Sequence, residues 1–203
     1  MNKWLITATI ALSIGFNLAH AAGNADEGKN QSAICAGCHG ADGNSPINPL
    51  WPKIAGQHPR YIEKQLKDFK SGARTDPTMA PMALPLNDQQ MADLAAYFSS
   101  QPRQIGKAAA DQVSAGEALY RAGNPETGVV ACMACHGPAG SGNPQANFPA
   151  IAGQHAAYVE KSLKDFRDGK RTNDASNMMQ GVVTRMSDEE MAAVAQYIQG
   201  LSR

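Results

Sequence analysis

Apolar side chains recur at helical spacing in two equivalent segments of the chain, residues 59–71 and 156–168. Each segment carries its large apolar residues at positions i, i+4 and i+7, which places them on one face of a helix. A glycine, which commonly ends a helix, follows each segment. The apolar residues are Ile62, Leu66 and Phe69 in the first segment, and Val159, Leu163 and Phe166 in the second. The pattern predicts two amphipathic helices of the same design.

A further helix is predicted towards the end of each half of the chain. Asn87 is followed three residues later by Gln90, and Ser187 by Glu190, which is the spacing of a capping box at a helix start. The apolar stripes that follow are Met91, Leu94, Ala95 and Phe98 in the first half, and Met191, Val194, Ala195 and Ile198 in the second.

Residues 24–34 and 113–122 are expected to form the first helix of each half. Glycine, proline, asparagine and aspartate are frequent in residues 40–56, which predicts a loop. No segment alternates apolar and polar residues as a half-buried strand would. The predicted fold class is therefore all-α.

Most of the chain consists of two similar copies in tandem. Residues 51–58, WPKIAGQH, match residues 148–155, FPAIAGQH, 97 positions later, and the offset becomes 100 after Thr172. This period indicates a duplicated domain, because solenoid repeats span only roughly 20–50 residues. The boundaries that we expect are residues 22–101 for an N-terminal domain, 102–112 for a linker and 113–203 for a C-terminal domain.

Residues 1–21 have the features of a secretory signal peptide, with Lys3 before an apolar run and a small-x-small cleavage site at 19–21. The run is short and interrupted by polar residues, whereas a membrane anchor needs ~20 apolar residues. We therefore expect cleavage and a mature protein outside the cytoplasm.

The whole chain has 18 basic and 18 acidic side chains, and this balance argues against nucleic acid as a partner.

Residues 35–39, CAGCH, and 132–136, CMACH, share the C-x-x-C-H pattern of covalent haem attachment. Two thiols add to the vinyl groups of one haem, and the following histidine ligates its iron. The alternatives are a zinc site of four thiolates, disulfides or a thioredoxin-like redox pair. A zinc site does not need the histidine that follows each pair, and a thioredoxin-like pair needs a surrounding βαβ pattern, which the sequence does not show. We expect two covalently bound haem c groups, with no thiol left for a disulfide. The predicted residues are Cys35, Cys38, His39, Cys132, Cys135 and His136.

A methionine is the first candidate for the sixth iron ligand in each domain. The duplication favours Met79 and Met179, which are equivalent at the offset of 100 and precede the last helix in a predicted loop. Met82 and Met178 are the respective alternates. They rank lower, because neither has a methionine at the equivalent position of the other domain.

His58 and His155 also recur, at the start of the two amphipathic helices. As axial ligands they would give haems with two histidines. Because each domain also offers a methionine, the preferred interpretation is a histidine that caps its helix or contacts a haem propionate.

The duplicated C-x-x-C-H, the W/F-P-x-I-A-G-Q-H segment, the methionine before the last helix and a final L/V-x-x-Y helix together resemble the dihaem cytochrome c4 family. The likeness covers essentially the whole predicted mature chain. It implies two tandem class I cytochrome c domains, each wrapped around one haem. It also implies that the axial methionines are Met79 and Met179.

The resemblance implies two structural details. The first and last helices of each domain should cross closely, with Gly28 and Gly116 lying against tyrosines of the last helices. A proline carbonyl should hold the ring nitrogen of each ligating histidine that does not bind iron, and Pro52 and Pro149 are the candidates.

The resemblance implies a periplasmic carrier that passes electrons from a quinol-oxidising cytochrome bc complex towards terminal oxidases. Histidine–methionine ligation leaves no open iron position, so we do not expect an enzyme. The alternatives are the haem subunit of a flavoprotein dehydrogenase, a dihaem peroxidase and a thiosulfate-oxidising dihaem cytochrome. We expect a monomer that works with redox proteins and whose domains face one another across a pseudo-twofold axis; peripheral membrane association is left open.

Basic side chains cluster on the two amphipathic helices and just after them. They could bind an acidic partner. Acidic residues interleave with them, so a solvated helix face is the preferred interpretation. The basic residues are Lys64, Lys67, Lys70, Lys161, Lys164, Arg167, Lys170 and Arg171.

Overall fold

The computed structural model describes residues 23–202, and the predicted signal peptide lies outside the described residues. This part of the chain is helical, and its only β-type pairings are the isolated bridges Asn124–Val129 and Asn143–Phe148. The predicted all-α fold class is confirmed. Within residues 23–202, every helix is too short or too polar to span a bilayer.

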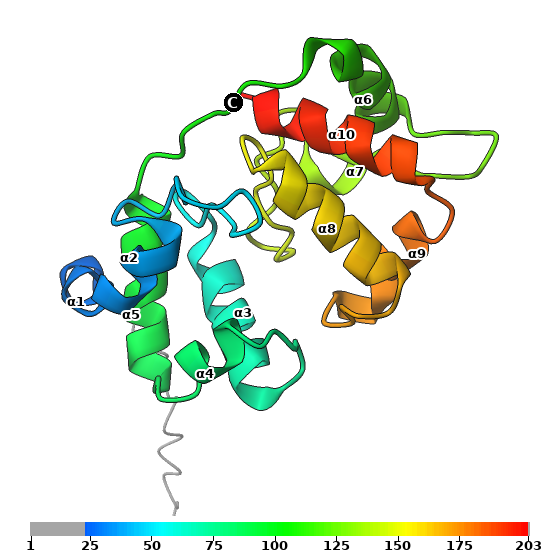
Figure 1. The fold of residues 1–203 in the computed structure, drawn as a ribbon. Helices are drawn as coiled ribbons and strands as arrows, with labels where there is room; N and C mark the ends of the chain where they lie inside the picture. Colours follow the sequence, from blue (N-terminus) through cyan, green and yellow to red (C-terminus); the bar gives the residue numbers. More distant parts are fainter. Residues whose placement is uncertain (1–22, 203) are drawn as a thin grey trace, which may run out of the picture.

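Two similar sets of helices follow one another along the chain (Figure 1). The N-terminal domain contains α1 (Ala25–Gln31), α2 (Ala33–His39), α3 (Pro59–Ser71), α4 (Met79–Ala83) and α5 (Asp88–Ser100). The C-terminal domain contains α6 (Ala110–Ala122), α7 (Met133–His136), α8 (Ala156–Arg167), the 3-10 turn η1 (Ala175–Asn177), α9 (Met178–Val183) and α10 (Asp188–Gly200). An extended segment joins α5 to α6, and the two sets are not intermixed (Figure 1).

The first helices differ from the prediction at their boundaries. The helix predicted over residues 24–34 is divided at Ser32, whose hydroxyl donates to the Lys29 carbonyl at 2.8 Å. The helix predicted over residues 113–122 begins earlier, at Ala110, inside the predicted linker. Alanines precede it, and alanine has the highest helix propensity of any residue, so the linker interpretation underestimated this start.

The first and last helices of each domain cross at a glycine. A Cβ atom placed on Gly28 would lie 2.0 Å from the Asp93 carbonyl oxygen of α5, and one on Gly116 would lie 2.2 Å from the Ala193 carbonyl oxygen of α10. The nearest side-chain atoms to the two positions are the Cβ atoms of Tyr97 and Tyr197. Only glycine permits this approach of two backbones, as the family resemblance implied.

The amphipathic helix of each domain packs on the last helix. The predicted stripe of α3 places Ile62 and Phe69 in the buried core, and α8 does the same with Val159 and Phe166. The predicted stripes of α5 and α10 face the same cores. These contacts fix the positions of the helices that follow each predicted haem motif.

Both predicted capping boxes are formed, and the one at α5 provides a test of stability. Asn87 Oδ1 accepts from the Gln90 N–H at 2.9 Å, and Gln90 Oε1 accepts from the Asn87 N–H at 2.9 Å. We expect Asn87→Ala to lower the free energy of unfolding by about 1 kcal/mol, because it leaves a helix N-terminal N–H without its acceptor. Denaturant unfolding of the haem-loaded protein measures this loss. The control is Ser100→Ala in the last turn of α5, and an equal loss in both variants would contradict the capping role.

Equivalent residues of the two domains contact each other reciprocally. Arg74 donates to the Tyr158 hydroxyl at 3.1 Å, and Arg171 donates to the Tyr61 hydroxyl at 2.8 Å. Each residue in one pair lies 97 positions from its counterpart in the other. Residues related by a twofold axis make contacts of this kind, so the domains face one another as expected.

Candidate functional site

The first C-x-x-C-H motif lies in α2, where the helix places Cys35 and Cys38 about one turn apart. His39 ends this helix and is only 7% exposed. Its Nδ1 lies 2.9 Å from the Pro52 carbonyl oxygen. A carbonyl oxygen only accepts hydrogen bonds, so Nδ1 carries the proton and Nε2 is left as the atom that can bind a metal ion. Burial also lowers the pKa of His39, which favours the neutral imidazole.

The second motif repeats this arrangement in and before the shorter helix α7. His136 is 8% exposed, and its Nδ1 lies 3.0 Å from the Pro149 carbonyl oxygen. Burial lowers the pKa of His136 as well. The carbonyl oxygens of Pro52 and Pro149 therefore bind the Nδ1 atoms of the two histidines, as predicted.

Within residues 23–202, none of the four cysteines is paired in a disulfide. Burial is the main reason that the pKa of Cys35 is raised and that the pKa of Cys132 is raised to about 11. Among residues 23–202, no three His, Cys, Asp or Glu side chains gather to hold a metal ion, which does not match the alternative of a four-thiolate zinc site. A thiol pair one helical turn apart, next to a histidine with a free Nε2, fits a covalently bound haem.

Met79 is the first residue of α4 rather than part of a loop. The Asp76 carboxylate causes this difference, because it accepts from the backbone N–H groups of Thr78 and Met79, both at 2.9 Å, and so caps the turn. Met79 is half-buried, whereas the alternate Met82 is 39% exposed.

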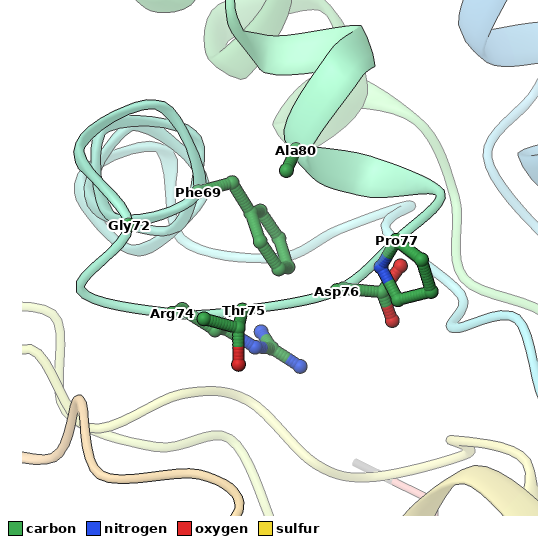
Figure 2. Close-up of a pocket in the computed structure, with 7 residues that line it drawn as sticks. All are labelled: Phe69, Gly72, Arg74, Thr75, Asp76, Pro77 and Ala80. Carbon is green, nitrogen blue, oxygen red and sulfur yellow. The ribbon is translucent and has the colours of Figure 1, made fainter.

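A hollow of about 330 Å³ lies next to this segment, between the end of α3 and the start of α4 (Figure 2). The Phe69 ring extends from α3 towards Ala80, the residue after Met79, and the Arg74 guanidinium lies 4.6 Å from the centre of that ring (Figure 2). The residues that line the hollow are Phe69, Gly72, Arg74, Thr75, Asp76, Pro77 and Ala80.

Met179 lies in the first turn of α9, again in a short helix where a loop was predicted. The change of offset from 97 to 100 is taken up just before it by the 3-10 turn η1, in which Ser176 and Asn177 have φ values of 53° and 55°. Met179 is half-buried and packs against the core of the C-terminal domain, whereas its neighbour Met178 is 43% exposed.

His58 and His155 occupy the N-cap positions of α3 and α8, but their side chains do not cap these helices. Each side chain instead reaches the other domain. His58 Nε2 lies 2.8 Å from the Ser141 carbonyl oxygen, and His155 Nε2 lies 2.9 Å from the Ser45 carbonyl oxygen. The prediction of a side-chain cap was wrong because the partner carbonyl lies across the domain interface, which the sequence does not reveal.

Sequence reasoning also missed the role of the duplicated arginines. Arg171 was grouped with surface basic residues, but it is only 7% exposed and stacks on the Phe166 ring at 4.4 Å, as Arg74 does on Phe69. Gln65 accepts from Arg74 at 2.7 Å and from Arg171 at 3.3 Å. The sequence contains one signal for this role. Arg74 and Arg171 are 97 positions apart, so both copies keep an arginine at the same distance after the amphipathic helix.

Lys64 also contacts the other domain, because its Nζ donates to the Asn173 carbonyl oxygen at 2.7 Å. The remaining basic residues fit the interpretation of a solvated helix face. Most of the basic side chains, Lys64 included, form ion pairs with acidic side chains of their own or an adjacent segment, so their charges are largely balanced locally. These pairs are Lys64–Asp68, Lys67–Glu63, Lys161–Asp165, Lys164–Glu160, Arg167–Asp188 and Lys170–Asp168.

Comparison with known proteins agrees with the duplicated geometry. The Cytochrome c family model matches residues 25–102 and again residues 113–202. Cytochrome c4 of Thiocapsa roseopersicina is 54% identical over 173 residues, which cover 85% of this chain and 89% of that protein. The chain belongs to the cytochrome c4 family. The crystal structure of reduced recombinant cytochrome c4 from Pseudomonas stutzeri matches with a TM-score of 0.86 at 46% identity, covering 89% of this chain and 100% of that chain.

As a member of the cytochrome c4 family, the chain is a dihaem electron-transfer cytochrome with two covalently bound haem c groups, one in each class I cytochrome c domain. The predicted family, fold and cofactors are confirmed. A less similar relative is the thiosulfate dehydrogenase electron acceptor of Stutzerimonas stutzeri strain A1501. It is 38% identical over 202 residues, which cover 96% of this chain and 93% of that protein.

Proposed function

We propose that this cytochrome carries single electrons through two haems, each held by one copy of the duplicated motif. When bound, each haem would supply a one-electron ferric–ferrous couple. In the N-terminal domain, Cys35 and Cys38 attach the haem, and His39 and Met79 ligate the iron. The corresponding residues of the C-terminal domain are Cys132, Cys135, His136 and Met179.

The observation that carries this proposal is the arrangement of donors, which is the same in both domains. Each domain has a thiol pair one turn apart, a buried histidine that offers only Nε2, and a half-buried methionine at the start of a short helix. One histidine and one methionine in each domain would hold the haem iron and would leave it no position for a substrate. These residues therefore support a carrier rather than an enzyme.

The proposed location and partners follow from the family. We place the mature protein in the periplasm after removal of residues 1–21, with domains at residues 22–101 and 113–203. The linker at 102–112 joins them, and its last residues already belong to α6. A quinol-oxidising cytochrome bc complex supplies the electrons, and terminal oxidases receive them. The protein acts as a monomer in this proposal.

A second candidate is a carrier dedicated to a dehydrogenase. The relative named thiosulfate dehydrogenase electron acceptor favours it, because that protein matches nearly the whole length of this chain. Such a carrier would use the same haems and ligands, and only the electron donor would differ. Reduction rates with a purified bc complex and with a thiosulfate dehydrogenase distinguish the two donors.

The ligation is tested by haem analysis of the exported protein. We expect two covalently attached haems per chain, a Met–iron charge-transfer band in the oxidised state, and no binding of carbon monoxide to the reduced protein. Binding of carbon monoxide to the untreated ferrous protein would mean that one iron has an open position, and it would favour the peroxidase-type alternative.

A further inference from the structure

A single peptide group links the histidine of each domain to a side chain of the other domain. In the N-terminal domain, the carbonyl oxygen of the peptide between Pro52 and Lys53 lies 2.9 Å from His39 Nδ1. The N–H of the same peptide donates to Gln154 Oε1 of the C-terminal domain at 2.8 Å. A continuous hydrogen-bonded chain therefore runs from His39 across the interface to Gln154.

The C-terminal domain contains the mirror arrangement. The carbonyl oxygen of the peptide between Pro149 and Ala150 lies 3.0 Å from His136 Nδ1. The N–H of that peptide donates to Gln57 Oε1 of the N-terminal domain at 2.9 Å. The two glutamines are equivalent at the offset of 97, so each one reaches the histidine of the opposite domain.

Both glutamines are held firmly in this orientation. Gln154 Nε2 donates to the Lys53 carbonyl oxygen at 2.8 Å, and Gln57 Nε2 donates to the Ala150 carbonyl oxygen at 2.8 Å. Gln57 is 7% exposed and Gln154 is 6% exposed, so water does not replace these bonds at low cost. The side-chain amides are fixed parts of the interface.

Hydrogen bonds that share a peptide group polarise one another. An acceptor on the N–H makes the carbonyl oxygen of the same peptide more negative, which strengthens the bond from the histidine Nδ1–H. A stronger bond at Nδ1 raises the basicity of the imidazole at Nε2, where it ligates a metal ion. A more basic ligand stabilises ferric relative to ferrous iron, so the reduction potential falls.

We propose that Gln154 is a positioning residue that lowers the reduction potential of the N-terminal haem, and that Gln57 lowers the potential of the C-terminal haem. Each domain thus adjusts the haem of its neighbour rather than its own. This inference rests on the proposed ligation of the two haems by His39 and His136.

The test uses Gln154→Leu and Gln57→Leu in the full haem-loaded chain. In Gln154→Leu, we expect the potential of the N-terminal haem to rise, so that the equilibrium constant for electron exchange with the C-terminal haem changes about threefold. This change is about 28 mV, because tenfold corresponds to 59 mV for a one-electron couple. In Gln57→Leu, the reduction potential of the C-terminal haem should rise instead. A redox titration followed by NMR, with haem methyl signals assigned to each domain, measures the individual potentials.

Tyr158→Phe is the matched control, because it removes a hydrogen bond across the same interface that does not involve either peptide. It should not reproduce the shift of Gln154→Leu. Gln154→Met is the second variant if Gln154→Leu does not accumulate. Its unbranched side chain fills irregular space well and also lacks the acceptor for the Lys53 N–H, so it should raise the potential of the N-terminal haem as well.

The inference requires that each glutamine substitution shifts the reduction potential of the haem in the opposite domain. The inference would be overturned if a substitution shifted the reduction potential of the haem in its own domain. It would also be overturned if both potentials shifted equally or if neither shifted. The same shift in Tyr158→Phe would also overturn it, because it would indicate general loosening of the interface. Each variant is first checked for two haems with Met–iron bands. A wild-type protein without two histidine–methionine haems would overturn the proposed function instead.

Discussion

Replacing Met79 by alanine is expected to lower the reduction potential of the N-terminal haem and to remove about half of the Met–iron charge-transfer absorbance. The thioether favours ferrous iron, so its loss favours the ferric state. Axial ligands set haem potentials over a range of ~0.8 V, and a fall on the order of 0.1 V or more is expected. Optical redox titration measures the fall, and the reduced variant should now bind carbon monoxide.

Met82→Ala is the matched control, because Met82 lies in the same short helix and is 39% exposed. It should keep both haem potentials and the full band. Met179→Ala and Met178→Ala form the corresponding pair in the C-terminal domain. If Met82→Ala lost the band and Met79→Ala kept it, the ligand of the N-terminal haem would be Met82.

The second large effect is expected at the helix crossing of the C-terminal domain. In Gly116→Ala, the new Cβ atom would lie 2.2 Å from a backbone oxygen of α10 and 2.7 Å from Tyr197 Cβ. Neither atom belongs to a flexible chain end, so α6 and α10 must move apart. Overpacking of a well-packed core costs about 1–3 kcal/mol and occasionally more, and we expect a loss at the upper end of this range. Thermal and denaturant unfolding of the haem-loaded variant measure it.

Gly181→Ala provides the opposite expectation in the same domain. Gly181 lies in α9, and a Cβ atom there would meet no other atom within 4 Å. Alanine in a helix interior is more stable than glycine by roughly 0.5–1 kcal/mol. The variant should therefore be as stable as the natural protein or slightly more stable. Similar destabilisation by both substitutions would show that the crossing is not specially tight.

The sequence predicted the fold well where the signal is local or repeated. Capping boxes and the i, i+4, i+7 stripes depend on residues within one or two turns, and α3, α5 and α10 begin where these signals indicate. The duplication supplied a second copy of each motif and so favoured Met79, which has an equivalent methionine, over the unpaired Met82. The crossing at Gly28 and Gly116 came from the family resemblance rather than from any periodic pattern.

Other features depend on contacts between distant parts of the chain, and the sequence did not show them. The His155 side chain bonds to the Ser45 carbonyl, and Arg171 enters the interface, because the two domains meet face to face. Helical spacing describes one element at a time, so it places Arg171 on a basic helix end without showing that another domain covers it. Short helices such as α4 were also missed, since a single turn capped by Asp76 has too few residues for a periodic signal.

The reciprocal bonds of Arg74 with Tyr158 and of Arg171 with Tyr61 have a consequence for the origin of the molecule. A surface whose arginine fits the tyrosine of an identical copy is self-complementary, so an ancestral one-haem chain with these residues could already pair with itself. Fusion of two gene copies would then preserve an existing dimer and free each half to diverge. The divergence is visible where Gln65 of one half corresponds to Ser162 of the other, so only one half supplies the amide that accepts from both interface arginines.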